Sequence, residues 1–326
     1  MLGADRGWSD SHPWRSHAQS RLVCSFISRI DNNDWVLREA SRHHTKHQRV
    51  GAVTANTKER TIMGEHPVPQ ERFRVDRLSV EIYATRDDMG IAAARAVARC
   101  MRSLLEEKNH IRMIFAAAPS QNEFLAELAS SPDLNWKRVT ALHMDEYVGV
   151  DADAPQSFVR YLRERLYDRV DPGIVHSLNG SASDLAVECE CYARLINAAP
   201  IDILCAGIGE NGHLAFNDPP GADFDAPETV KVVDLTLTCR EQQVHDGCFP
   251  DLDSVPRQAL TLTIPAMMVA SYAFCVVPGP TKAEAVRDTL LEPISAACPA
   301  TILRRHQSAV LYVDADSARL FRSERG

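Results

Sequence analysis

The side chains best suited to chemistry lie close together in residues 201–220, which read IDILCAGIGENGHLAFNDPP. A short apolar run there ends in a glycine-rich turn, and His213 follows with Asn211, Asn217 and Asp218 beside it. An imidazole near a carboxylate can move protons at neutral pH. Open α/β sheets bind ligands beyond the carboxyl ends of their strands, where this turn is expected. We therefore expect His213 to belong to a ligand-binding site.

The same turn also fits a dinucleotide-binding fingerprint. Gly207, Gly209 and Gly212 have the required spacing, and Asp234 follows roughly 20 residues on, as the ribose-binding acid would. The fingerprint needs a helix that opens at its third glycine, whereas residues 213–226 contain two prolines and show no helical period. We therefore expect no nicotinamide cofactor, and no other organic cofactor or metal is indicated.

Charged groups elsewhere in the chain could join this site. The predicted strand 137–142 leads to Asp145 and Glu146, whose side chains point in opposite directions on an extended chain, so that only one can face a pocket. A carboxylate opposite the imidazole would complete the equipment for proton shuttling. Lys282 and Arg240 could supply positive charge for a phosphate, although a single exposed cation is more often merely solvated.

A third strand end carries a candidate anion site at Ser120. The predicted strand 111–118 is broken by Pro119, and Ser120-x-x-Glu123 fits a capping box, which predicts a helix from Gln121. The free N–H groups and dipole at such a helix start suit a phosphate. An ordinary turn between strand and helix explains these residues equally well.

Strands alternate with helices over most of the chain, which predicts a doubly wound, mainly parallel α/β sheet with helices on both faces, a Rossmann-like fold. In such a sheet the three strand ends can converge on one crevice. We expect one domain over residues 76–326. The expected strands are 78–84, 111–118, 137–142, a short one near 175, 201–205, 230–237, 260–264, 273–277 and 309–313; the expected helices are 86–108, capped by Thr85, 121–128, 156–167, 183–198 and 281–291.

The first 75 residues show little periodicity, and we expect a poorly ordered N-terminal extension there. Met63 offers an alternative start for translation. The chain has 326 residues, a net charge of −8 and no apolar run of membrane-spanning length. We therefore expect no nucleic-acid partner and no membrane span. Nine scattered cysteines and the lack of a secretory signal favour the cytoplasm.

Two long motifs resemble the signatures of glucosamine-6-phosphate deaminases, also called glucosamine-6-phosphate isomerases. These motifs are HMDEYVG at residues 143–149 and GIGENGHLAFNDP at residues 207–219. The resemblance extends in order over about residues 78–315 and includes CR at 239–240 and PGPTKA at 278–283. The related 6-phosphogluconolactonases share a similar glycine-histidine turn, but the MDEY segment favours the deaminase branch.

The resemblance implies a role for each matching residue. Asp145 matches the base that moves a proton between C2 and C1 of the opened amino sugar, and His213 matches the histidine that assists ring opening. Asp218 stands where the family usually has a glutamate that supports this histidine, and Arg240 and Lys282 match groups that hold the phosphate. The implied reaction converts glucosamine 6-phosphate to fructose 6-phosphate and ammonia without a cofactor. Homo-oligomers are common in the family.

The chain departs from the family at three places. Its phosphate loop reads AAAPSQ at residues 116–121 and lacks the usual glycines, so Ser120 must do more of the binding. Asn211 stands where some members have an aspartate. Asp218 is one methylene shorter than glutamate, which could lose a contact needed for proton transfer. These departures suggest a changed substrate or rate.

Two other functions stay open. A sugar-phosphate lactonase would use His213 as general base on water and would not need Asp145. A non-catalytic sugar-phosphate sensor would keep the pocket without turnover. Replacement of Asp145 by asparagine separates the deaminase or isomerase from the lactonase, because only the isomerase activity should then be lost. The joint presence of Asp145, His213, Arg240 and Lys282 favours an enzyme.

Overall fold

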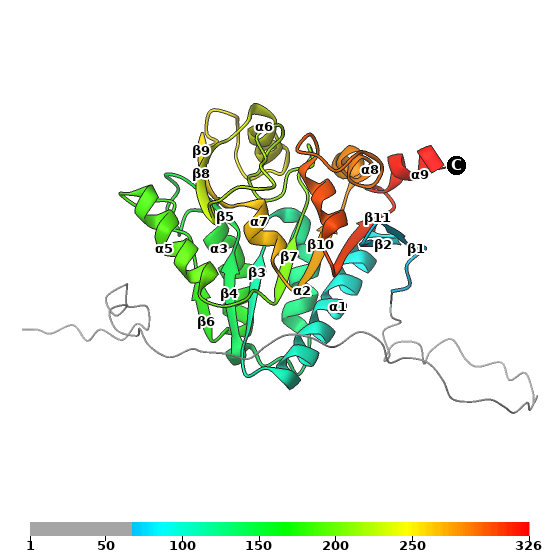
Figure 1. Cartoon of the computed structure of the whole chain (residues 1–326), viewed down its shortest axis with the longest axis horizontal. Helices are drawn as coiled ribbons and strands as arrows, with labels where there is room; N and C mark the ends of the chain where they lie inside the picture. Colours follow the sequence, from blue (N-terminus) through cyan, green and yellow to red (C-terminus); the bar gives the residue numbers. More distant parts are fainter. Residues whose placement is uncertain (1–66, 326) are drawn as a thin grey trace, which may run out of the picture. The chain divides into compact units, whose positions relative to one another are not determined.

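An eight-stranded sheet organises residues 67–325, the part of the chain that the computed structural model describes (Figure 1). Its strands pair in parallel except for β1 and β2, which form an antiparallel hairpin. The order across the sheet is β1 (Glu71–Val75), β2 (Leu78–Tyr83), β11 (Ala309–Asp314), β10 (Tyr272–Val277), β7 (Ile203–Ala206), β3 (Ile111–Phe115), β4 (Val139–His143) and β6 (Ile174–His176).

Helices cover both faces of this sheet. Successive residues of a strand point to opposite faces, so each face carries apolar side chains that pack against helices. Met113 and Phe115 of β3 belong to the apolar cluster under the first group of helices, whereas Ile114 belongs to the other cluster. The doubly wound, mainly parallel fold predicted from the sequence is therefore confirmed. The first group comprises α1 (Arg86–Glu107), α2 (Asn122–Ser130) and α3 (Phe158–Leu162); the second comprises α5 (Leu185–Asn197), α7 (Ile264–Met268), α8 (Ala283–Leu291) and α9 (Arg319–Arg325).

The strand order changes direction between β3 and β7. The chain continues outward from β3 to β4 and β6, whereas from β7 it continues the other way to β10 and β11, although β3 and β7 pair directly. Such a switch point opens a crevice at the carboxyl ends of the strands. The segments that follow β3, β4 and β7 are those that carry Ser120, Asp145 and His213.

A second, three-stranded antiparallel sheet stands beside these strand ends. It joins β5 (Asp145–Tyr147), β9 (Gln258–Leu262) and β8 (Val230–Asp234). Two of its strands were expected near their observed positions, but periodicity cannot identify a strand's partner, so the separate sheet was not predicted. Pairing of Asp145 with Thr261 fixes the catalytic candidate at the edge of this sheet.

α1 begins where the sequence predicts. Thr85 has extended backbone geometry, and its side chain accepts a hydrogen bond from the Asp88 N–H at 3.1 Å. The helix predicted over 156–167 is instead interrupted, because α3 passes into a π-helical segment (Arg163–Tyr167) before α4 (Asp168–Val170). None of the helices within residues 67–325 is long and apolar enough to cross a membrane.

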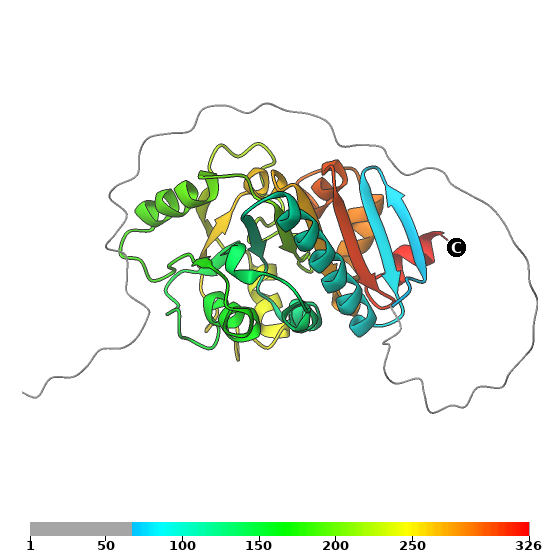
Figure 2. The ribbon, with the colours of Figure 1, turned by 90° about the horizontal axis from the view of Figure 1, so that it is seen from below.

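Regular secondary structure begins earlier in the chain than predicted, at β1 and not at the strand expected from residue 78. β1 lies within the expected N-terminal extension, and Phe73 of β1 stacks on Phe321 with ring centroids 5.2 Å apart. Figure 2 shows the β1–β2 hairpin at one edge of the sheet, beside β11. The remainder of that predicted extension, residues 1–66, lies outside the described residues. Helices α6 (Leu237–His245), α7 and α9 were also not predicted.

Candidate active site

One pocket at the switch point brings the three predicted strand ends together. The segments after β3, β4 and β7 all contribute to its wall, and α6 closes it from a fourth direction. Of the sequence-predicted residues, Ser120, Asp145, Gly209 and His213 line the pocket. Its other lining residues are Ala116, Ala117, Ala118, Pro119, Gln121, Met144, Phe158, Gly207, Ile208, Ala215, Phe216, Gln242, Gln243, Asp246 and Cys248.

The two adjacent carboxylates have different surroundings, as the extended backbone predicts. Asp145 lines the pocket, and burial together with the neighbouring charge of Glu146 raises its pKa well above the ordinary value. The Glu146 carboxylate instead accepts hydrogen bonds from the Ser157 hydroxyl at 2.8 Å and from three backbone N–H groups. Asp145 is therefore available for proton transfer, and Glu146 holds the start of α3.

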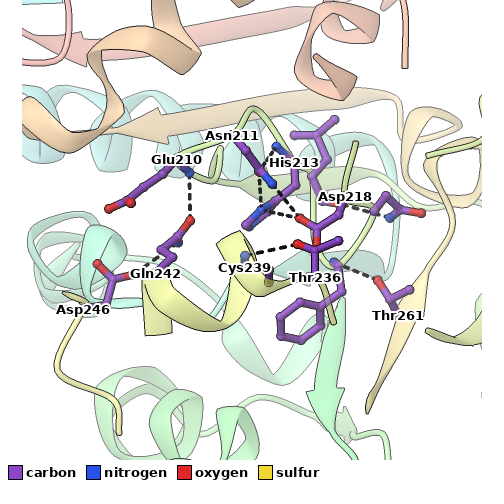
Figure 3. Close-up of polar contacts among 12 residues, drawn as sticks. Glu210, Asn211, His213, Asp218, Thr236, Cys239, Gln242, Asp246 and Thr261 are labelled. Atoms are coloured by element: carbon purple, nitrogen blue, oxygen red, sulfur yellow. Dashed lines mark hydrogen bonds and ion pairs between the residues drawn. The ribbon is translucent and has the colours of Figure 1, made fainter. Parts of the chain in front are cut away.

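His213 is oriented through its Nδ1 atom (Figure 3). Nδ1 lies 2.8 Å from Asn211 Oδ1 and 3.0 Å from Asp218 Oδ1. Two acceptors at this nitrogen require it to carry the proton, which leaves Nε2 as the nitrogen available to a ligand. His213 is 7% exposed, so the orientation of its ring is fixed by these two contacts and by the surrounding loop.

Asp218 contacts His213 although its side chain is one methylene shorter than the glutamate usual in the family. Besides His213, its carboxylate accepts a hydrogen bond from Asn211 Nδ2 at 3.1 Å and one from the Thr236 hydroxyl at 2.9 Å. Burial alone would raise the pKa of Asp218, but the hydrogen bond and charge of His213, followed by the hydrogen bonds from Asn211 and Thr236, outweigh it and lower the pKa to about 2. Asp218 thus remains a carboxylate at working pH and can stabilise a protonated His213.

The glycines of the turn shape the space around the imidazole. A Cβ atom on Gly209 would lie 2.2 Å from His213 Nε2, so only glycine permits the observed ring position. Gly212 has φ +81° and is not among the lining residues, and a Cβ atom on it would lie 2.6 Å from Cys298 Sγ. Its role is therefore to form the turn, in which its N–H donates to the Gly209 carbonyl at 3.0 Å.

The loop after β3 differs from the predicted capping box. A 3₁₀ turn (Pro119–Gln121) precedes α2, which starts at Asn122 without a side-chain cap. Ser120 accepts a hydrogen bond from Gln121 Nε2 at 3.1 Å, and Glu123 forms an ion pair with Arg86 at 2.8 Å. The prediction of a capping box was wrong because both of its side chains have other partners. Ser120 still lines the pocket.

The two predicted phosphate cations, Arg240 and Lys282, are not among the residues that line the pocket. The Arg240 guanidinium donates to the backbone carbonyls of Leu252 and Val255, the latter at 3.1 Å. Lys282 is 4% exposed, and burial lowers its pKa despite the nearby charges of Asp246 and Glu210. Their assignment to a phosphate stays a prediction.

Residues from α6 were missed by sequence reasoning. Gln242, Gln243 and Asp246 line the pocket, while Thr236 both caps the helix and holds Asp218. The one signal available was Thr236 itself, since threonine is a favoured N-cap residue. The polar sequence LTCREQQVH gives too weak an apolar stripe to predict the helix.

Three atoms of this network could in principle bind a metal ion. His213, Asp218 and Cys239 each offer one ligand atom, all within 4.8 Å of one another. Burial, followed by the charge of Asp218 and a hydrogen bond to it, raises the pKa of the Cys239 thiol far above its ordinary value. Because the thiol stays protonated and Nδ1 is already hydrogen-bonded, we assign these groups to the support of His213.

Fold and site together define a doubly wound α/β protein with a carboxylate and an oriented imidazole at its switch point. Residues 84–312 match the family described as glucosamine-6-phosphate isomerases/6-phosphogluconolactonase. The chain belongs to this family, which confirms the resemblance carried by the two sequence motifs. It is 33% identical over 227 residues to the glucosamine-6-phosphate deaminases of Bacillus thuringiensis (strain Al Hakam) and Bacillus cereus (strain AH820), covering 70% of this chain and 84% of each relative.

Solved structures agree with this assignment. A monomeric glucosamine-6-phosphate deaminase superposes with a TM-score of 0.68 at 30% identity, covering 74% of this chain and 99% of that one. A 6-phosphogluconolactonase from Thermotoga maritima superposes with a TM-score of 0.58 at 24% identity, covering 72% and 99% of the two chains. The second likeness concerns the fold alone.

Proposed function

We propose that this chain is an amino-sugar-phosphate deaminase that converts glucosamine 6-phosphate and water to fructose 6-phosphate and ammonia. One observation carries the proposal. Asp145, with a raised pKa, and His213, oriented through Nδ1, line the same pocket. Isomerisation of an aldose to a ketose needs this pair of groups, one to open the ring and one to move a carbon-bound proton.

His213 would act first, at the ring oxygen. Its Nε2 atom can take the proton of the C1 hydroxyl and carry it to that oxygen as the bond from the ring oxygen to C1 breaks, which gives the open-chain aldehyde. Asp218 stays ionised and would stabilise the imidazolium form between transfers. Asn211 would hold the ring through the same Nδ1 atom, so Nε2 remains directed to the substrate.

Asp145 would then move the carbon-bound proton. As a carboxylate it removes the proton from C2 while the C1 oxygen gains a proton released by the ammonium group, which gives an enolamine. As a carboxylic acid it then returns its proton to C1, which gives a protonated ketose imine. Water adds to C2 of the imine and ammonia leaves, so the atoms balance. A pKa raised by burial suits this alternation, because the carboxylate then binds a proton more strongly than an ordinary aspartate and can hold it until it is returned to C1.

The test compares two substrates with the purified protein. We expect ammonia and fructose 6-phosphate in equal amounts from glucosamine 6-phosphate, followed by ¹H and ³¹P NMR, and no acceleration of 6-phosphogluconolactone hydrolysis. Hydrolysis of the lactone without ammonia release would replace the proposal by the lactonase function. Binding of both sugar phosphates without turnover of either would favour a sensor.

A further inference from the structure

A second cavity lies apart from the catalytic pocket, beside the segments that lead into β10 and β11. It has a volume of about 380 Å³, and none of residues 67–325 lines both it and the catalytic pocket. Its walls come from α7 with the loop 269–271, from the end of the 3₁₀ segment (Pro299–Arg305) and from Phe224. The cavity therefore lies at the amino ends of these strands, whereas the catalytic pocket lies at carboxyl ends. Its size is that of a small-molecule site, which commonly holds about 300–1,000 Å³.

His306 joins two walls of this cavity. Its Nδ1 atom accepts a hydrogen bond from the Ser308 N–H at 3.0 Å, so Nε2 carries the proton and donates to the Ala270 carbonyl at 2.8 Å. His306 is 4% exposed, and burial lowers its pKa, so the neutral form that makes both contacts is favoured. The loop before β10 and the segment before β11 are thereby held together, and the cavity is formed before a ligand binds.

Most of the side chains that line this cavity are apolar. Phe224, Met268 and Val269 each leave part of their surface open to solvent, and Val269 is 69% exposed. A ligand that covers such surface gains about 25 cal/mol for each Å² of apolar area removed from water. Methionine adapts its shape to the group that it contacts. The wall therefore suits an aromatic or branched aliphatic group.

Arg305 gives this cavity a positive charge. Within residues 67–325 its side chain forms no hydrogen bond or ion pair, whereas the neighbouring Arg304 pairs with Asp76 at 2.7 Å and donates to the Glu292 carbonyl at 2.6 Å. Among the described residues, no carboxylate lines the cavity. A free guanidinium can donate to both oxygens of a carboxylate through its planar fork. Arg305 is therefore available to an anionic group of a ligand.

We propose that this cavity binds a small carboxylate with an apolar body, such as an aromatic monocarboxylic acid. The apolar body would lie against Phe224 and Met268, and the carboxylate would pair with Arg305. A sugar phosphate suits the cavity poorly, because its hydroxyl groups would face apolar side chains that offer no hydrogen bonds. The inference concerns a site separate from the catalytic pocket and does not rest on the proposed function.

The test uses the full chain with 4-phenylbutyrate as the probe, and calorimetry measures its binding. We expect Arg305→Gln to raise the Kd about tenfold, because a charge-assisted contact is lost. Val269→Asp should also weaken binding, since it places a negative charge beside the ligand carboxylate, and its exposed position lets the variant fold. The uncharged 4-phenylbutanamide should bind the wild type about tenfold more weakly than the carboxylate.

Arg319→Gln is the matched control. Arg319 is exposed and lines neither the catalytic pocket nor this cavity, so this variant should keep the Kd of the wild type. Saturating fructose 6-phosphate should leave that Kd unchanged, because the two sites are separate. Equal Kd values for Arg305→Gln and Arg319→Gln would overturn the inference. Competition by fructose 6-phosphate, or a wild type that does not bind the probe at millimolar concentration, would overturn it as well.

Discussion

At the scale of single residues, surroundings decide what chemically identical groups can do. Asp145 and Glu146 are adjacent carboxylates, yet Glu146 accepts four hydrogen bonds and Asp145 faces the pocket. The Glu146 carboxylate therefore holds the backbone at the start of α3, whereas the Asp145 carboxylate is free to exchange a proton. Asp218 is a third case, because its partners keep it ionised next to His213.

Replacement of Asp218 by asparagine should make stability depend less on pH. The ordinary pKa of 3.8 falls to about 2 in the folded protein, which corresponds to about 2 kcal/mol at 1.36 kcal/mol per pKa unit. Since the folded pKa is depressed, this contribution is present above about pH 4 and is lost as the pH falls through about 2. At pH 7, Asp218→Asn should lower the free energy of unfolding by about 2 kcal/mol.

Denaturant unfolding of both proteins from pH 7 to pH 2 measures this effect. The difference between wild type and variant should shrink toward the acid end of the range. A difference that stays constant over the whole range would show that the Asp218 charge does not stabilise the fold.

Replacement of Gly209 by alanine should displace His213. The added Cβ atom would lie 2.1 Å from His213 Cε1, so the ring must move, and loss of alignment by about 1 Å can cost about 10²-fold in rate. Kinetics with glucosamine 6-phosphate check this. Gly221→Ala is the control, because the nearest atom there is 3.7 Å from an added Cβ. Equal activity of the two variants would contradict the assigned position of the imidazole.

At the scale of elements, α6 links the pocket wall to Asp218, the carboxylate beside His213. Thr236 caps this helix by accepting from the Cys239 N–H at 3.2 Å, and its hydroxyl donates to Asp218 at 2.9 Å. Thr236→Val keeps the shape of the side chain but removes both contacts. We expect it to destabilise the protein by about 1–3 kcal/mol and to reduce kcat.

Thermal unfolding and kinetics of Thr236→Val and Thr236→Ser together test this link. Serine keeps the hydroxyl and should restore both stability and kcat. If serine restores stability alone, the Thr236 hydroxyl caps α6 but its contact with Asp218 does not support turnover.

The elements that were predicted from sequence are those with strong local signals. β7 is a continuous apolar run that ends at a glycine, and α1 combines a long apolar stripe with a threonine cap. Since strand ends converge at a switch point, the presence of Asp145, His213 and Ser120 in one pocket follows from such signals. The family motifs then suggested a role for each of them.

The remaining features depend on packing that no local pattern encodes. α6 is mostly polar, so Gln242, Gln243 and Asp246 were not predicted to line the pocket. Arg240 was assigned to a phosphate by its position in the chain, but its direction is set by the carbonyls of the loop that follows α6. Pairing of β1 with β2 likewise rests on five residues, too few for a periodic signal.

At the scale of the whole molecule, β1 joins the start of the described residues, 67–325, to α9. β1 is tied to the C-terminal helix by the stacking of Phe73 on Phe321 and by an Arg322–Glu71 ion pair at 2.7 Å. A chain that starts at Met63 keeps β1, and we expect its kcat and melting temperature to equal those of the full chain. A chain that starts at Asp76 lacks β1 and should melt several degrees lower, because buried aromatic packing is lost.

Calorimetry and kinetics on the full chain and these two shortened chains check this prediction. A large loss of turnover in the chain that starts at Met63 would contradict it, since residues 1–62 would then be required for the site.

The central claim is that Asp145 moves the carbon-bound proton of an amino-sugar phosphate in this pocket. The most direct measurement is the rate of fructose 6-phosphate and ammonia release from glucosamine 6-phosphate by wild type and Asp145→Asn, with fructose 6-phosphate binding to show that the variant is folded. General acid–base catalysis contributes about 10²–10⁴-fold, so we predict a loss of that size in the variant with binding retained. A variant that keeps a rate within about threefold of wild type would contradict the account.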